Sequence, residues 1–171
     1  MTKCTTWDCI EDLKIYIDSI RDDRLIVLTS MGADPLHVGH SRCILYSSNL
    51  GELIVVVNSD GFLIRKKGFV FMPLEERMEI ISSLKGVKHV IAWDDGTQYV
   101  DGALRRIRPD FFTKGGDRST LASIAETEVQ ACKDIGCTLL LGVGGKDKIQ
   151  SSSALIEGAK QYVSIYKKGS I

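Results

Sequence analysis

Two adjoining segments decide the fold: Leu25-Ile-Val-Leu-Thr29 and Met31-Gly-Ala-Asp-Pro-Leu-His-Val-Gly-His40. The first is continuously apolar or β-branched, which is typical of a parallel strand buried on both faces. The residues after His40 read as a helix, and two histidines three apart at a helix start lie on one face. Backbone N–H groups at a helix N-terminus attract anions. The two segments therefore predict a strand, a tight turn and a helix that bind phosphate.

Further apolar runs repeat the alternation of strand and helix. The predicted strands after the first are Glu52–Val57, Val87–Trp93, Asp110–Lys114 and Cys137–Gly142. Helical patterns between them predict right-handed crossovers, and hence an α/β fold with a Rossmann-like parallel sheet of five strands and helices on both faces. We expect residues 25–171 to form this domain. Residues 1–24 are expected to form a helical extension, because apolar residues recur at helical spacing within Thr6–Ile20.

Other segments lack a clear periodic pattern. The stretches Gly61–Met72 and Gly142–Gln150 are predicted to be irregular loops. Near the C-terminal end, a helix is expected over Ser151–Gln161, followed by an extended segment over Tyr162–Tyr166.

Composition excludes several classes of protein. Lysine plus arginine equals aspartate plus glutamate at 22 each, which argues against a general nucleic-acid binder or a membrane-surface protein. No apolar run is long enough to span a membrane, and the first residues lack the apolar centre of a signal peptide, so we expect a cytoplasmic protein. The five cysteines are an odd number without C-x-x-C spacing, which predicts free thiols.

Polar residues follow each predicted strand, at the edge where parallel sheets bind ligands. Asn58 and Asp60 follow the second strand, and Lys114, Gly115, Gly116 and Asp117 follow the fourth. The two glycines permit close approach to a base or ribose, although a plain turn would look the same. Ser151, Ser152 and Ser153 open the last helix, where serine is a common cap and where hydroxyl and N–H groups also bind phosphates.

Cationic residues lie between the second strand and the next helix. Arg65-Lys-Lys67 ends at a glycine and is either a solvated charge cluster or a phosphate-binding group. Arg77 either binds a phosphate or pairs with Glu75 or Glu76, and the sequence does not decide between these.

These motifs resemble a known superfamily. The elements are Asp34 three residues before His37-Val-Gly-His40, then Val57-Asn-Ser-Asp60, Arg65-Lys-Lys-Gly68, Pro73-Leu-Glu-Glu-Arg77, Arg108-Pro-Asp110, Lys114-Gly-Gly-Asp117 and Ser151-Ser-Ser-Ala-Leu-Ile156. In this order they are similar to the nucleotidyltransferases that transfer a nucleoside monophosphate from a nucleoside triphosphate. They most resemble the adenylyltransferase domain of D-glycero-β-D-manno-heptose 1-phosphate adenylyltransferases, with glycerol-3-phosphate cytidylyltransferases as near relatives.

The resemblance implies the nucleotidyltransferase fold and a set of roles. His37, His40 and Lys67 would be catalytic and stabilise charge on the phosphates. Asn58, Asp60, Arg65 and Arg77 would contact the acceptor. The nucleotide would be bound by the residues Ser30, Met31, Gly32, Asp34, Gly39, Lys114, Gly115, Gly116, Asp117, Ser151, Ser152 and Ser153. Mg²⁺ would arrive with the nucleotide, because it prefers phosphate oxygens and water to a protein cage. A homodimer is also expected from the resemblance.

The expected function is transfer of AMP from ATP to a small phosphorylated acceptor such as heptose 1-phosphate, with release of pyrophosphate. Three alternatives stay open at this point. One is a CTP-dependent cytidylyltransferase that acts on glycerol phosphate or a similar polyol phosphate. Another is a cofactor-pathway adenylyltransferase that acts on phosphopantetheine or nicotinamide mononucleotide. The third is a non-catalytic nucleotide-binding module, which would release no pyrophosphate with any acceptor.

Overall fold

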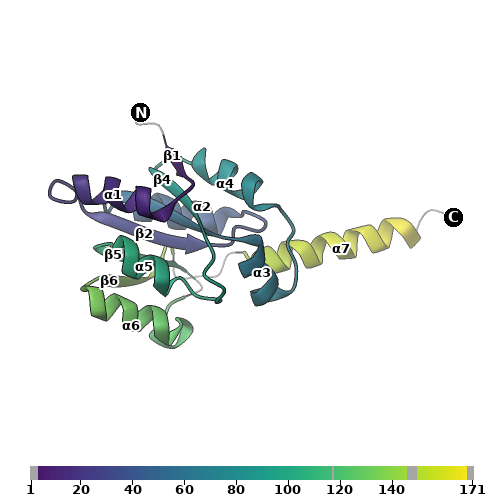
Figure 1. Ribbon diagram of the computed structural model, residues 1–171. Coiled ribbons are helices and arrows are strands. Elements are labelled where there is room, and N and C mark those ends of the chain that lie inside the picture. Colours follow the sequence, from purple (N-terminus) through teal and green to yellow (C-terminus); the bar gives the residue numbers. More distant parts are fainter. Residues whose placement is uncertain (1–3, 117, 146–149, 169–171) are drawn as a thin grey trace.

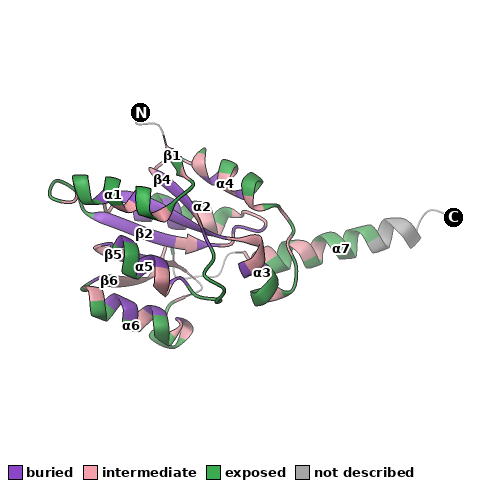
Figure 2. Cartoon of the chain, viewed as in Figure 1, coloured by how far each residue is buried: buried purple, intermediate pink, exposed green. Residues whose placement is uncertain are grey.

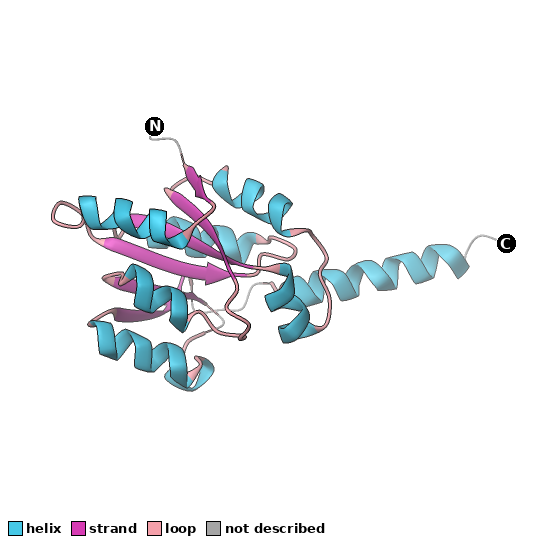
Figure 3. Ribbon diagram, viewed as in Figure 1, coloured by secondary structure: helices cyan, strands magenta, loops and turns pink. Residues whose placement is uncertain are grey.

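The computed structural model describes residues 4–116, 118–145 and 150–168, with side chains of the last helix described as far as Val163. Across these ranges one sheet contains six parallel strands in the order β1-β4-β3-β2-β5-β6 (Figures 1 and 3). The strands are β1 Thr5–Trp7, β2 Ile26–Met31, β3 Glu52–Asn58, β4 His89–Trp93, β5 Phe111–Gly115 and β6 Thr138–Val143. The predicted parallel α/β fold is confirmed, but the predicted number of five strands is wrong.

The sixth strand lies in the N-terminal segment that was expected to be wholly helical. Thr5 pairs with His89 and Trp7 with Ile91, so β1 extends the edge of the sheet beside β4. The indole Nε1–H of Trp7 donates a hydrogen bond to Nδ1 of His89 at 3.1 Å, and this bond holds the short strand in place. The helix α1 begins only at Ile10 and ends at Ile20. Three residues are too few to show the alternation typical of a strand, so this strand is recognised only by its pairing with β4.

Helices cover both faces of the sheet, as predicted (Figure 1). One layer consists of α1, α5 (Asp101–Ile107) and α6 (Glu126–Ile135), which share a buried apolar cluster with one face of the sheet. The opposite layer consists of α2 (Val38–Ser48) and α4 (Leu74–Ser82), which pack on the other face. In Figure 2 the labelled strand β2 is purple over most of its length, and the neighbouring strand β3 is buried along its whole length. This burial explains its continuous apolar sequence.

Two expectations about irregular segments are wrong. The stretch predicted as a loop contains α3 (Asp60–Lys67), which begins after the cap Ser59 and ends at Gly68 in the left-handed conformation. Ser59 Oγ accepts the N–H of Phe62 at 3.0 Å, which compensates for a sequence without clear apolar periodicity. The predicted extended segment Tyr162–Tyr166 belongs instead to α7 (Ser152–Lys168), which projects away from the sheet (Figure 1).

Between β5 and α6, a 3₁₀ turn covers Leu121–Ser123. All five cysteines are free thiols, as predicted. Within the described residues, no helix is both long and apolar enough to cross a membrane.

Candidate active site

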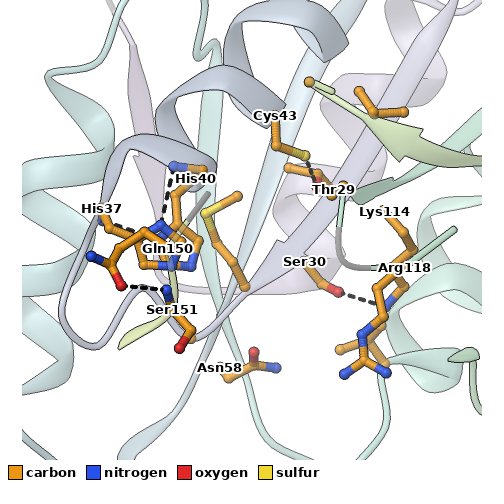
Figure 4. A pocket seen from close by; sticks show the side chains of 18 of the residues that line it. Thr29, Ser30, His37, His40, Cys43, Asn58, Lys114, Arg118, Gln150 and Ser151 are labelled. Carbon is orange, nitrogen blue, oxygen red and sulfur yellow. Dashed lines mark hydrogen bonds between the residues drawn. The ribbon is translucent and has the colours of Figure 1, made fainter. Parts of the chain in front are cut away.

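A cavity of about 240 Å³ opens at the carboxyl ends of β2 and β5, beside the first turn of α2. It brings together eleven of the predicted site residues, which are Ser30, Met31, Gly32, His37, Gly39, His40, Asn58, Lys114, Gly115, Gly116 and Ser151. Figure 4 shows His37, His40 and Ser151 on one side, with Ser30 and Lys114 on the opposite side. Segments separated by more than a hundred positions in the sequence therefore line one cavity.

The two histidines are oriented by the backbone at the start of α2. Nδ1 of His37 accepts the N–H of Gly39 at 3.1 Å, and Nδ1 of His40 accepts the N–H of His37 at 3.2 Å. The ring centroids lie 3.9 Å apart. A neutral imidazole carries one proton, and a nitrogen that accepts a hydrogen bond is the unprotonated one. In the neutral form, each ring therefore carries its proton on Nε2, where it is a hydrogen-bond donor.

The charge state of His40 follows from its surroundings. Burial, and then the nearby His37, lowers the pKa of His40 to about 3. The ring is therefore neutral near pH 7 and acts as an oriented donor instead of a cation. Positive character beside the two rings comes instead from the N-terminus of α2.

Gly39 is required by the packing of the motif. A Cβ atom at this position would lie 2.9 Å from Cε1 of His37, which is closer than side chains tolerate. The glycine thus lets the His37 ring fold back over the start of α2, and it leaves the backbone accessible in the cavity wall.

The serine triplet divides into three environments. Ser151 lines the cavity, and its Oγ accepts the N–H of Ala154 at 3.2 Å as a cap of α7. Ser152 donates to the carbonyl of Pro35 at 2.8 Å and so fastens the start of α7 to the turn after β2. Ser153 is exposed. Only Ser151 of the three lines the cavity.

Lys114 forms an ion pair that sequence reasoning missed. Its Nζ lies 2.8 Å from Oε2 of Glu128 and donates to Oγ of Ser30 at 3.2 Å. Oε1 of Glu128 accepts the N–H of Val100 at 3.3 Å, which connects α6 to the segment before α5. The sequence did contain a signal for Glu128. It lies three and four residues before the apolar Ala131 and Cys132, which places all three on the inward face of α6.

Lys67 and Asp34 contact each other instead of lining the cavity. Nζ of Lys67 lies 2.6 Å from Oδ2 of Asp34, whose carboxylate also accepts the N–H groups of Phe71 and Met72. Burial raises the pKa of Asp34, but the hydrogen bonds from these three residues outweigh it and hold the pKa below its usual value. Asp34 therefore anchors the segment after α3. The neighbouring Lys66 lines the cavity.

Among the residues expected to contact the acceptor, Asn58 lines the cavity. Arg77 is 1% exposed and donates to the carbonyls of Met72, Gly32 and Asn58 and to the carboxylate of Asp60. It pairs with Asp60 and not with Glu75 or Glu76, and it ties together the turns that form the site. Arg65 pairs with Asp94 and donates to the carbonyl of Thr97. Asp117 lies outside the described residues.

A second cavity of about 310 Å³ adjoins the first. It lies between the segment before α5, where Gln98 and Tyr99 lie, and the segment between β5 and α6. The residues that line both cavities are Lys66, Lys114, Arg118 and Glu128. Lys66, Arg118 and Glu128 were not among the predicted site residues. The site thus consists of two chambers with a common wall of charged side chains.

The fold and the site define a parallel α/β protein with a cavity at the carboxyl ends of its strands and a His-x-Gly-His sequence at the start of the helix beside it. The chain belongs to the cytidylyltransferase-like family, whose model matches residues 33–141. This match covers the motif, the strands β3 to β5 and Lys114, and it begins just after β2. The resemblance inferred from the sequence is therefore confirmed, and the chain is a nucleotidyltransferase-family protein.

Individual relatives agree with the family. The chain is 33% identical over 126 residues to the bifunctional protein HldE of Pseudomonas syringae pv. syringae, a match that covers 71% of this chain and 26% of the relative. The match to the bifunctional protein HldE of Escherichia coli O1:K1 / APEC is 35% identical over 111 residues and covers 63% and 23%. The chain spans about a quarter of the length of these relatives.

A solved structure shares the fold. The crystal structure of the lipopolysaccharide core biosynthesis protein from Thermoplasma volcanium GSS1 aligns with a TM-score of 0.59 at 27% identity. The alignment covers 72% of this chain and 99% of that protein.

Proposed function

We propose that this protein transfers AMP from ATP to a small phosphorylated acceptor, such as heptose 1-phosphate, and releases pyrophosphate. The observation that carries the proposal is the joint presence, in one cavity, of the His37 and His40 rings, the start of α7 at Ser151, and Lys114 with its two glycines. The imidazole N–H groups and the N-termini of α2 and α7 supply donors to a triphosphate, which nucleotidyl transfer requires.

The proposed reaction needs no covalent enzyme intermediate. A phosphate oxygen of the acceptor attacks the α-phosphorus of ATP in line, a new P–O bond forms, and the bond to the β,γ-pyrophosphate breaks. The Nε2–H groups of His37 and His40 donate to phosphate oxygens as negative charge moves toward the leaving group. Because both rings are already held by backbone N–H groups, they need little reorganisation during the reaction.

Lys67 has a conditional role in this proposal. In the structure it contacts Asp34, so its Nζ would have to exchange this carboxylate for a phosphate oxygen when substrates bind. The segment between α3 and α4, which Asp34 anchors through Phe71 and Met72, would move with it.

Mg²⁺ belongs to the proposal as part of the nucleotide substrate. Among the described residues, no group of three or more His, Cys, Asp or Glu side chains is arranged to hold a metal ion. The phosphates of the nucleotide and water would supply its ligands.

The proposed acceptor is supported indirectly, through the proteins that this chain resembles. The motifs resemble heptose 1-phosphate adenylyltransferases, and the solved relative is named a lipopolysaccharide core biosynthesis protein. Both favour a sugar phosphate. A homodimer, expected from the same resemblance, remains a prediction to be measured by light scattering.

The test is a matrix of pyrophosphate release with ATP, CTP, GTP or UTP against heptose 1-phosphate, glycerol 3-phosphate, phosphopantetheine and nicotinamide mononucleotide. We expect release with ATP and the sugar 1-phosphate. The double variant His37→Ala/His40→Ala, purified in parallel, controls for contaminating enzymes. Activity with CTP alone would replace the adenylyl assignment by a cytidylyl one. Binding of ATP without release for every acceptor would show a non-catalytic module.

A further inference from the structure

A buried carboxylate lies in the wall shared by the two cavities. Glu128 is 7% exposed and lines both of them. Burial of a carboxylate is unfavourable unless it is paired, and the contact with Lys114 at 2.8 Å supplies the pair. A carboxylate offers about four acceptor positions. Lys114 and the N–H of Val100 use two of them, which leaves capacity for donors of a ligand.

The charge of Glu128 restricts the ligand group that lies against it. The carboxylate oxygens of Glu128 are hydrogen-bond acceptors, so they exclude ligand groups that offer only acceptors. The phosphate-binding groups His37, His40 and Ser151 lie on the opposite side of the first cavity from Lys114, the ion-pair partner of Glu128 (Figure 4). A ligand group at Glu128 must therefore donate hydrogen bonds. Because Lys114 already balances the charge, an uncharged hydroxyl fits better than an ammonium group.

The second cavity has the dimensions and lining for the organic part of an acceptor. Its volume of about 310 Å³ lies in the range of small-molecule sites. Gln98 and Tyr99 add polar groups at one side, and Ala122 and Ala125 keep the other side open. Its common wall with the first cavity includes Lys66, so an acceptor phosphate near this cation would face the nucleotide.

We propose that the second cavity binds the hydroxyl-bearing part of the phosphorylated acceptor and that Glu128 selects this part by accepting hydrogen bonds from its hydroxyl groups. The inference rests on the proposed nucleotidyl transfer to a sugar phosphate and adds to it the place where the hydroxyl-bearing part of that acceptor binds. It also assigns Glu128 as a specificity-determining residue.

The first test uses the unaltered protein, ATP or whichever nucleotide is active, and paired acceptors. Heptose 1-phosphate is compared with its single deoxy derivatives, and glycerol 3-phosphate with propyl phosphate. We expect kcat/KM to fall about tenfold for the derivative without the hydroxyl that contacts Glu128, which corresponds to loss of one hydrogen bond to a charged group. Equal kcat/KM values for every acceptor and its deoxy derivatives would overturn the inference.

The second test changes the residue. Glu128→Gln retains the shape but removes the charge, and Glu126→Gln makes the same charge change at an exposed position of the same helix turn. We expect Glu128→Gln to reduce the preference for the hydroxylated acceptor at least threefold, while Glu126→Gln leaves that preference unchanged. A purely structural role would instead lower kcat/KM equally for both acceptors of a pair, and that outcome would refute the specificity role.

The outcomes separate the two proposals. Absence of pyrophosphate release from the unaltered protein refutes the proposed function itself. Release without discrimination between hydroxylated and deoxy acceptors refutes only the role of Glu128. If Glu128→Gln fails to fold, the comparison of acceptors on the unaltered protein still decides.

Discussion

The replacement His40→Ala tests the geometry of the site most directly. It removes one donor, the Nε2–H that the hydrogen bond from the backbone N–H of His37 to Nδ1 orients at 3.2 Å. Loss of one preorganised donor at a developing charge lowers kcat by about 10²–10³, equivalent to about 2.7–4 kcal/mol of transition-state stabilisation. We expect a loss of this size in the rate of pyrophosphate release, with a smaller change in the KM for ATP.

The same replacement has a limited structural cost. The N–H of His37 loses an acceptor at the start of α2, which costs about 1 kcal/mol. A domain of this kind has roughly 5–15 kcal/mol of stability, so the variant should remain folded. The expected loss of transition-state stabilisation is thus larger than the expected loss of folding stability, and the two can be measured separately.

The assay measures kcat and KM by pyrophosphate release at pH 7.5, together with circular dichroism to confirm folding. Ser41→Ala, an exposed position next to His40 on the same helix turn, is the matched control and should retain full activity. A folded His40→Ala protein with kcat within threefold of the unaltered protein would refute the donor role. An equal loss in Ser41→Ala would attribute the effect to the helix start as a whole.

Three further predictions concern stability, each measured by urea unfolding. Because the folded pKa of His40, about 3, lies below the ordinary 6.5, the unfolded chain binds more protons between these values. The free energy of unfolding should fall as pH drops from 6.5 toward 3, by up to about 1.4 kcal/mol per pH unit. His40→Ala should make this pH dependence weaker. An unchanged slope in the variant would contradict burial of the neutral ring. Asp34→Asn should lower the free energy of unfolding by about 2 kcal/mol, because the contact with Lys67 and the hydrogen bonds from Phe71 and Met72 weaken. A loss below about 0.5 kcal/mol would show that Asp34 does not anchor the segment between α3 and α4. Arg77→Met should lower the free energy of unfolding by about 3 kcal/mol, because four buried or half-buried acceptors lose their donor. Arg65→Met, which removes a more exposed ion pair, should lower it by less than about 1 kcal/mol. Equal losses in the two variants would refute the argument from burial.

The sequence alone was sufficient where the signal is local. The apolar run before Ser30 predicts a buried strand, and the two histidines with Gly39 predict the start of a phosphate-binding helix. The sequence also indicated that Lys114, near the carboxyl end of β5, and Ser151, after β6, would lie near each other, because the carboxyl ends of parallel strands meet at one edge. These residues line one cavity in the structure.

Other features depend on partners distant in the sequence. The strand Thr5–Trp7 exists because β4 offers an edge to it, and α3 forms with a cap at Ser59 in place of an apolar repeat. Lys66 and Lys67 are neighbours in one cationic run, yet Lys66 lines the cavity and Lys67 contacts Asp34. Helix geometry turns successive side chains by about 100°, so the helix decides which lysine faces the site.

Local pattern therefore determined the class of fold, most of its elements and the helix start at the two histidines, because strand and helix periods and helix caps depend on a few adjacent residues. Only the tertiary structure decided which charges pair and which face a ligand. Glu128 acquires its position from Lys114 and Val100, and Arg77 from carbonyls on three separate turns. Burial and pairing are properties of the packed chain, since they depend on atoms that the sequence places far apart and folding brings within 3 Å or so of each other.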